Sequence, residues 1–241
     1  MTPSGIAPPT IYRRHLLLFT KYPTPGFAKT RLIPTLGADG AAGLSRALSE
    51  HALGVARACV AAAPTPTALT VWYAGGDGDA VAAWLGPPRP GEAYRPQPDG
   101  DLGARFVGAF GVALGGPTAA PGAVAVVIGA DIPGMVPADV EAAYAALEGP
   151  APPPAVLGPA ADGGFYLLGV GRPPDAAALA GLPWGGGNAR SATAARLGGV
   201  VLGRVLRDVD EAEDVKVWEA VAQAKADGGW AGGGGVRIPD V

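Results

Sequence analysis

The chain has 241 residues, of which 49% are hydrophobic and only 16% are charged. This composition provides material for the core of one large α/β domain and excludes an intrinsically disordered chain. The formal net charge of −3 gives no basic field for nucleic acid, and no apolar stretch is long and uninterrupted enough for a membrane span.

Short runs rich in β-branched or aromatic residues alternate with longer stretches rich in Ala and Leu. The first predicted strand is His15–Thr20, and the first helix is Asp39–Ala62, where apolar residues recur near the helical period. The elements expected after these are strand Thr67–Tyr73, helix Asp77–Leu85, helix Leu102–Leu114, strand Ala123–Gly129, helix Pro137–Leu147, strands Ala155–Leu157 and Phe165–Val170, strand Val200–Leu206 and helix Glu211–Lys225.

This alternation predicts a largely parallel central sheet with helices on both faces. We expect one domain over residues 15–225, preceded by a flexible tail at 1–14 and followed by a Gly-rich tail at 226–241. In such sheets ligands bind outside the carboxyl ends of the strands. The residues that follow each strand are therefore the candidates for a functional site.

The first polar cluster follows the first strand, over Lys21–Leu32. Prolines and Gly26 predict an irregular loop, in which Lys21, Lys29 and Arg31 can converge with Thr30 and backbone N–H groups on an anionic phosphate chain. The loop has neither the Walker A spacing nor the G-x-G-x-x-G pattern. The alternative is a solvated basic surface loop.

The second cluster centres on Asp131, directly after the most hydrophobic strand. A carboxylate at that position, beside a phosphate-binding loop, is suited to hold Mg²⁺, or Mn²⁺ in its place. A cap for the helix at Pro137 is the alternative, although six residues is too far for an N-cap. Asp210 is a second candidate ligand, or else the cap of the closing helix.

Two further clusters have simple structural explanations beside the functional ones. Asp162, Gly163 and Gly164 form a turn signal between two strands, yet the glycines would also let the backbone approach a ligand. Asp101 is the expected N-cap of its helix, with Arg105 about one turn on. We count Asp101 and Arg105 among the substrate-binding candidates.

Covalent hydrolytic catalysis is disfavoured, because His15 and His51 do not build a triad and no serine has a nucleophile-elbow context. The single cysteine, Cys59, has neither a disulfide partner nor metal-ligand spacing. A reducing, cytoplasmic location is consistent with that.

Six motifs in order carry a resemblance to a known family. They are K-Y-P-T-P-G-F-A-K-T-R-L, G-D-L-G-A-R, I-G-A-D-I-P-G-M, L-G-P-A-A-D-G-G-F-Y-L-L-G, P-W and D-V-D-E-A-E-D. From His15 to Trp218 the chain resembles the DUF2064 family, also called radical-SAM/selenodomain-associated transferase 1, whose members have the glycosyltransferase-A fold. That family is similar to the nucleotidyltransferases of molybdenum-cofactor biosynthesis.

The resemblance implies a Rossmann-like three-layer α/β/α sandwich with a mostly parallel sheet. It also implies that the loop around Gly26, Lys29 and Arg31 holds nucleotide phosphates and that Asp131 and Asp210 form the metal site. Asp162, Gly163 and Gly164 would line the acceptor side, and Trp184 is a further candidate for binding nucleotide or substrate. One departure is Gly185–Gly187 after Trp184, where the family usually has Ser or Thr.

The sequence thus predicts a metal-dependent transferase that uses a nucleoside triphosphate or a nucleotide sugar and an unidentified small-molecule acceptor. Lys29, Arg31 and Asp131 are the expected catalytic residues. A single carboxylate in place of a D-x-D pair favours nucleotidyl over glycosyl transfer. The alternative is a nucleotide-binding module without catalysis, and a homodimer is left open.

Overall fold

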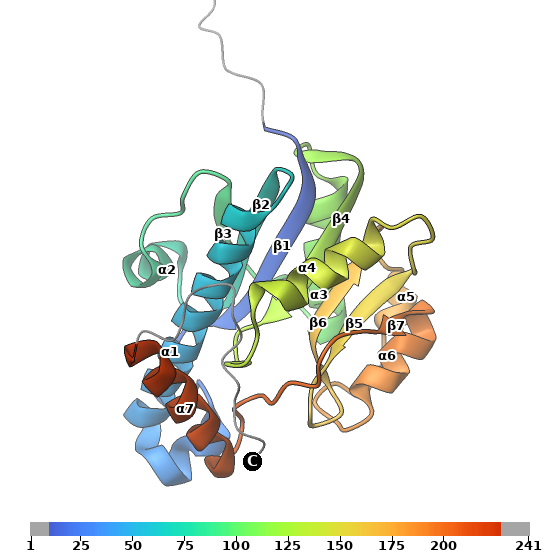
Figure 1. The fold of residues 1–241 in the computed structure, drawn as a ribbon. Helices are drawn as coiled ribbons and strands as arrows, with labels where there is room; N and C mark the ends of the chain where they lie inside the picture. The colour runs from blue at the N-terminus through green and yellow to red at the C-terminus, as the bar shows by residue number, and fades with distance from the viewer. Residues whose placement is uncertain (1–9, 228–241) are drawn as a thin grey trace, which may run out of the picture.

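Side chains alternate along the first strand, β1 (Tyr12–Lys21), and this alternation defines two cores. Leu16 and Leu18 are buried in the core on one face of the sheet, whereas Leu17 and Phe19 are buried in the core on the other. The computed structural model describes residues 10–227 and shows a three-layer α/β/α arrangement around β1 (Figure 1). The predicted fold class is therefore confirmed.

The other elements have the following bounds: η1 (Thr30–Leu32), α1 (Ile33–Ala62), β2 (Thr67–Ala74), α2 (Gly78–Leu85), β3 (Glu92–Pro96), α3 (Leu102–Gly115), β4 (Ala119–Gly129), α4 (Pro137–Leu147), β5 (Ala155–Pro159), β6 (Phe165–Val170), α5 (Ala176–Leu179), α6 (Ala189–Leu197), β7 (Val200–Val201), η2 (Ala212–Asp214) and α7 (Val215–Ala226).

The strands form one seven-stranded sheet in the order β3-β2-β1-β4-β6-β5-β7. Strand β6 runs antiparallel to its neighbours β4 and β5, and the remaining pairings are parallel. After β1 the chain moves outward through β2 and β3 and then returns to place β4 on the opposite side of β1. The topological switch point of the sheet therefore lies between β1 and β4.

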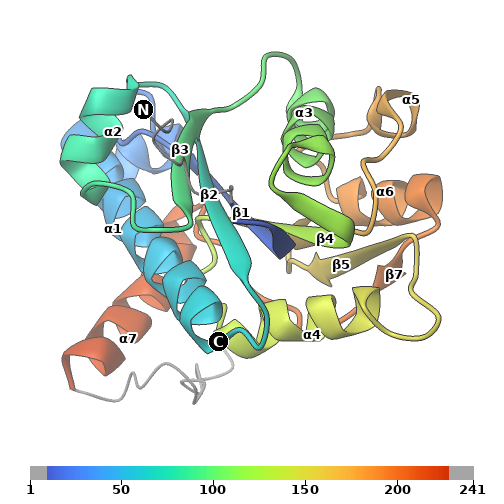
Figure 2. The ribbon, with the colours of Figure 1, turned by 90° about the horizontal axis from the view of Figure 1, so that it is seen from above.

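Helices cover both faces of this sheet (Figure 2). On one face α1 and α4 pack on the core that contains Leu16 and Leu18, and α7 packs against the first half of α1. On the other face α3, α5 and α6 pack on the core around Phe106 and Phe110. No helix in the described part of the chain is long and apolar enough to cross a bilayer.

The last predicted strand is wrong in extent. Val200–Leu206 was expected to be extended throughout, but β7 contains only Val200 and Val201, and Leu206 makes an isolated bridge to Ala160. Gly203 has a φ of 87°, in the left-handed region, which interrupts the strand. Because β7 is an edge strand that pairs only with β5, no strand on its other side holds the residues after Val201 in the sheet.

Four elements were absent from the prediction: η1, β3, α5 and α6. In α1 the predicted start at Asp39 falls just after Gly37, whose φ of 71° and ψ of 169° break the helix after a first short turn. Residues 12–14, assigned to the tail, belong to β1. Most of the two predicted tails, 1–9 and 228–241, lies outside the described residues.

Arg14 joins β1 to α4 through a buried charged network. Its guanidinium donates to both carboxylate oxygens of Glu141, at 2.8 and 3.1 Å, and to both of Glu148, at 2.6 and 3.0 Å. It also lies 4.6 Å from the ring centroid of Tyr144. Because the Arg14 side chain is only 4% exposed, these partners replace the water that would otherwise solvate its positive charge.

We expect Arg14→Ala to lower the free energy of unfolding by roughly 2–4 kcal/mol, because it removes four charge-assisted hydrogen bonds and leaves the partly buried Glu148 unpaired. Urea denaturation would measure the change. Arg46→Ala is the matched control, since Arg46 pairs with Glu50 on the exposed surface of α1 and should contribute at most about 0.5 kcal/mol. Equal effects of the two substitutions would contradict the assigned role of Arg14.

Candidate functional site

A cavity of about 380 Å³ opens at the carboxyl edge of the sheet, at the switch point between β1 and β4. It is bounded by the ends of β1, β2 and β4, by the first half of α1 and by the start of α3. Its polar lining residues are Thr20, Lys21, Lys29, Ser45, Ser49, Gln97, Arg105 and Asp131. Its volume is within the range of small-molecule sites.

The loop after β1 presents Lys29 to this cavity. Ala28 is fully buried and anchors the loop, and Lys29 has a φ of 46°. Among residues 10–227 it is the one non-glycine residue with a positive φ, a conformation that costs roughly 1–2 kcal/mol. The backbone strain is located at the residue whose side chain enters the site.

The Lys29 ammonium group lies between two carboxylates from distant parts of the chain. Its Nζ is 3.1 Å from Asp131 Oδ2 and 2.7 Å from Asp210 Oδ1. Burial of the Lys29 side chain acts to lower its pKa, but the charges and hydrogen bonds of Asp131 and Asp210 more than offset this, so the pKa is raised. Lys29 is therefore a permanent cation at the mouth of the cavity.

The two carboxylates are positioned by backbone contacts and do not cap helices. Asp131 follows β4, and its carbonyl oxygen accepts a hydrogen bond of 3.0 Å from Val209 N, which brings the segment before η2 alongside. Other carboxylates cap the helices that follow. Asp139 accepts from the Val136 N–H at the N-terminus of α4, and Asp214 accepts from the N–H groups of Asp210 and Glu211 at the N-terminus of η2. The capping alternatives for Asp131 and Asp210 are thus excluded.

A second, smaller cavity of about 160 Å³ adjoins the first. The two cavities share six lining residues: Leu102, Phe106, Gly129, Asp131, Phe165 and Tyr166. Its remaining walls include Asp162, Gly164, Trp184 and Asp208. Asp131 is the one charged residue in both linings, so the two cavities meet at its carboxylate.

Close contact between two glycine-rich segments forms one side of the second cavity. Gly164 N donates to Asp162 Oδ1 at 2.7 Å and fixes the turn after β5, while Gly163 has a φ of 87°. A Cβ at Gly163 would collide with the Gly187 carbonyl group. Gly163 and Gly187 therefore pack backbone against backbone, a contact that leaves no room for a side chain at Gly163.

The predicted residues are distributed unequally over the two cavities. Lys21 and Arg105 line the first cavity, and Asp162, Gly164 and Trp184 line the second. Arg31 is 65% exposed and lies 3.5 Å from Asp210 Oδ2, at the rim. Asp210 lines neither cavity and reaches the site through its ion pair with Lys29. Gly26, Thr30, Asp101 and Gly163 also line neither cavity, and Asp101 caps α3 by accepting from Ala104 N at 2.9 Å.

Lys21 and Arg105 are themselves held by the protein. Lys21 Nζ donates to the Phe27 carbonyl oxygen at 2.8 Å, which braces the loop. Arg105 Nη1 donates to Gln97 Oε1 at 2.9 Å, and the Gln97 amide donates to the carbonyl oxygens of Thr20 and Trp72. Gln97 thus connects Arg105 to the ends of β1 and β2.

Several lining residues were not predicted from the sequence. The Ser49 hydroxyl group donates its hydrogen bond to the Ser45 carbonyl oxygen. In the hydrogen bond of 2.8 Å between Ser49 and Thr20, the Thr20 hydroxyl group is therefore the donor. Gln97 was missed because it follows β3, a strand that was itself missed. Asp208 lies in the same acidic run as Asp210, and burial together with the charges of neighbouring aspartates raises its pKa to about 6.

We expect Gly163→Ala to destabilise the protein by about 1–3 kcal/mol, because it combines a left-handed backbone with a collision against Gly187. Urea denaturation would measure this. Gly54→Ala is the matched control: Gly54 is exposed in α1 with open space around it, so alanine should stabilise by up to about 1 kcal/mol. A neutral Gly163→Ala would show that residues 162–164 and 185–187 can separate freely.

The topology and the position of the cavity define the chain as a doubly wound α/β protein. The family model described as "Uncharacterized protein conserved in bacteria (DUF2064)" matches residues 55–186. The chain belongs to this family, and the resemblance drawn from its motifs is confirmed. Asp131 and Asp162 fall inside the matched region, whereas Lys29 and Asp210 lie outside it.

Solved structures share this fold. A protein from Desulfovibrio desulfuricans G20, provisionally described as a nucleotide-diphospho-sugar transferase, is 29% identical with a TM-score of 0.72, covering 86% of this chain and 87% of that one. A 4-diphosphocytidyl-2C-methyl-D-erythritol synthase is 13% identical with a TM-score of 0.54, covering 88% of this chain and 98% of that one. Comparison with curated proteins found no match.

A third structure, a CMP:2-keto-3-deoxy-manno-octonic acid synthetase complexed with CTP, is 14% identical with a TM-score of 0.51. It covers 89% of this chain and 99% of that one. At these low identities the two synthetases support the fold alone.

Proposed function

We propose that this protein is a metal-dependent transferase that takes a nucleoside triphosphate or a nucleotide sugar in the larger cavity and transfers a nucleotidyl or glycosyl group to a small acceptor in the smaller one. The observation that carries the proposal is the Lys29 ammonium group, which lines the larger cavity and lies between Asp210 and Asp131, the carboxylate that borders both cavities. The description of the neighbour from Desulfovibrio desulfuricans G20 as a nucleotide-diphospho-sugar transferase is consistent with the proposal.

The charges at this junction fit a nucleotide diphosphate or triphosphate. Lys29 supplies a buried cation and Arg31 a second cation at the rim. Both can donate to phosphate oxygens and stabilise the negative charge that develops on the leaving group. The larger cavity adds Arg105 and the hydroxyl group of Thr20, which can fix the rest of the donor.

The carboxylate oxygens at this junction also fit a divalent cation. Asp131 Oδ2 and Asp210 Oδ1 both face the Lys29 Nζ, so two carboxylate oxygens from different segments converge on one point. Mg²⁺ prefers such oxygens, completed by phosphate oxygens and water. When bound, it would neutralise the phosphates and orient them. Lys29 would then turn from the carboxylates to the phosphates.

Catalysis in this site needs no protein nucleophile. In nucleotidyl transfer an acceptor oxygen forms a bond to the α-phosphorus, the bond to pyrophosphate breaks, and the acceptor's proton leaves to water. In glycosyl transfer the new bond is to the sugar carbon, and a nucleoside diphosphate leaves. In both reactions the residues described act by positioning and by electrostatic stabilisation.

The rival function is nucleotide binding without catalysis. The Gly185–Gly187 segment removes the side chains that the family usually provides beside Trp184, which favours this rival. Product analysis separates the candidates when the protein is incubated with nucleotide, Mg²⁺ and an extract of small molecules. Pyrophosphate release would select nucleotidyl transfer, nucleoside diphosphate release would select glycosyl transfer, and binding without product would support the module.

Lys29→Ala should weaken nucleotide binding about 10- to 100-fold, because it removes a charge-assisted contact to phosphate. Thermal shift with a panel of nucleoside triphosphates and nucleotide sugars would measure it, with Mg²⁺ present. Lys216→Ala, at an exposed position of α7, is the control that should bind like the wild type. If no nucleotide stabilises the wild-type protein, the proposed function fails.

Asp131→Asn should abolish the Mg²⁺ dependence of nucleotide stabilisation and reduce product formation at least about 100-fold, since a neutral amide is a poor ligand for Mg²⁺. Mg²⁺ titrations of both proteins at fixed nucleotide would show this. Asp79→Asn removes an equal charge from an exposed position in α2 and should change neither property. An unchanged Mg²⁺ requirement in Asp131→Asn would reject the metal assignment.

A further inference from the structure

The lining of the smaller cavity carries negative charge and no positive charge. Asp131, Asp162 and Asp208 belong to it, and none of its lining residues is Lys, Arg or His. The larger cavity, in contrast, contains Lys21, Lys29 and Arg105. The larger cavity is therefore suited to a ligand with negative charge, and the smaller cavity to a ligand that is neutral or positively charged.

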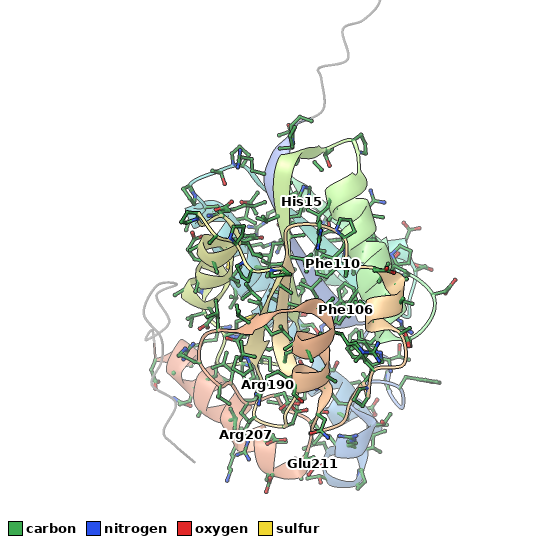
Figure 3. All side chains as sticks on the ribbon, turned by 90° about the vertical axis from the view of Figure 1, so that its right-hand side faces the viewer. His15, Phe106, Phe110, Arg190, Arg207 and Glu211 are labelled. Atoms are coloured by element: carbon green, nitrogen blue, oxygen red, sulfur yellow. The ribbon has the colours of Figure 1, made fainter. Side chains whose placement is uncertain are left out.

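Two of these carboxylates have no cation of their own. Within residues 10–227 neither Asp162 nor Asp208 takes part in an ion pair, whereas Asp131 is paired with Lys29. Two arginines labelled in Figure 3 pair with neither carboxylate. Arg190, from α6, donates to the carbonyl oxygen of Ala160, a lining residue of this cavity, and Arg207 pairs with Glu213 and Asp214. The oxygens of Asp162 and Asp208 can therefore accept hydrogen bonds from a ligand.

Opposite this charge the cavity has an aromatic wall. Phe106, Phe165 and Trp184 form a cluster in which the ring centroids lie 5.9 to 6.4 Å apart. The Trp184 Nε1–H is buried and has no hydrogen-bond partner within the described residues. Small residues, among them Gly164, Gly185 and Gly186, complete the lining and leave room beside the rings.

From this combination we infer that the smaller cavity is the acceptor subsite and that it favours a monosaccharide-sized acceptor without anionic groups. Hydroxyl or ammonium groups of the acceptor donate to Asp162 and Asp208, and its carbon face lies against Trp184 and Phe165. This inference rests on the proposed function for the role of acceptor, but the selectivity is a property of the cavity itself.

The physical basis is the cost of bringing like charges together beside Asp208, which is half-buried, and Asp162, which is exposed. A phosphate or carboxylate on the acceptor would face these two unpaired carboxylates, so repulsion weakens its binding. A neutral polyol can donate several hydrogen bonds, and an ammonium group adds charge attraction and contact with the rings. An acceptor that carries its own phosphate should therefore bind this subsite more weakly than its neutral counterpart.

Direct binding to the full-length protein tests the inference without requiring turnover. Saturation-transfer NMR, with competition to rank affinities, compares four probes on one scaffold: glucose, glucosamine, glucuronate and glucose 6-phosphate. We expect glucose and glucosamine to bind and the two anionic probes to bind at least about tenfold more weakly. Raising the salt concentration should narrow the difference between glucosamine and glucose.

Asp208→Asn identifies the cavity in which the probes bind. It should weaken glucosamine at least about fivefold and reduce the discrimination against glucuronate, while Asp79→Asn leaves both unchanged. Anionic probes that bind as well as glucose, an Asp208→Asn variant with unaltered selectivity, or no binding of any probe would overturn the inference.

These outcomes are separable from failure of the proposed function. If no nucleotide stabilises the protein but the probes bind with the expected order, the selectivity of the cavity stands and its role as an acceptor subsite falls. If nucleotides bind at Lys29 and the anionic probes bind as well as glucose, the proposed function stands and this inference falls.

Discussion

The charge on Lys29 is the constraint around which the site is organised. Asp131 follows the end of β4 and Asp210 comes from a segment nearly eighty residues later, and their like charges would repel without a cation between them. Lys29 reaches that place only because its own backbone adopts a left-handed conformation. The loop after β1, the end of β4 and the segment before η2 are thus held together by one ammonium group.

The fold places this ammonium group at the switch point of the sheet. Strands β1 and β4 are neighbours although β2, β3 and three helices separate them in the chain, so their carboxyl ends open a crevice that no local loop closes. Polar residues that follow these strands necessarily share one space. The same topology accounts for the division into two cavities, because α3 and β6 form the boundary on the side of Phe106 and Phe165.

The parts of this arrangement that sequence could predict are those that depend on local pattern. Apolar runs located β1, β2, β4 and β6, and position after a strand was sufficient to select Lys29 and Asp131. The edge strand β3 was missed because its sequence contains Glu92 and Arg95 and so has no continuous apolar run; none of its residues is fully buried. Contacts between distant loops, such as Gly163 with Gly187, leave no local pattern, because both segments satisfy the simple signal of a turn.

Asp131 borders both cavities, and this shared wall has a thermodynamic consequence. Any group that draws on its charge from one side changes the electrostatic potential felt on the other, so occupancy of the two cavities is coupled. By linkage the coupling free energy is the same in both directions: whatever the first ligand does to the affinity of the second, the second does equally to the first. The carboxylate of Asp131 thus ties the affinity of each cavity to the occupancy of the other.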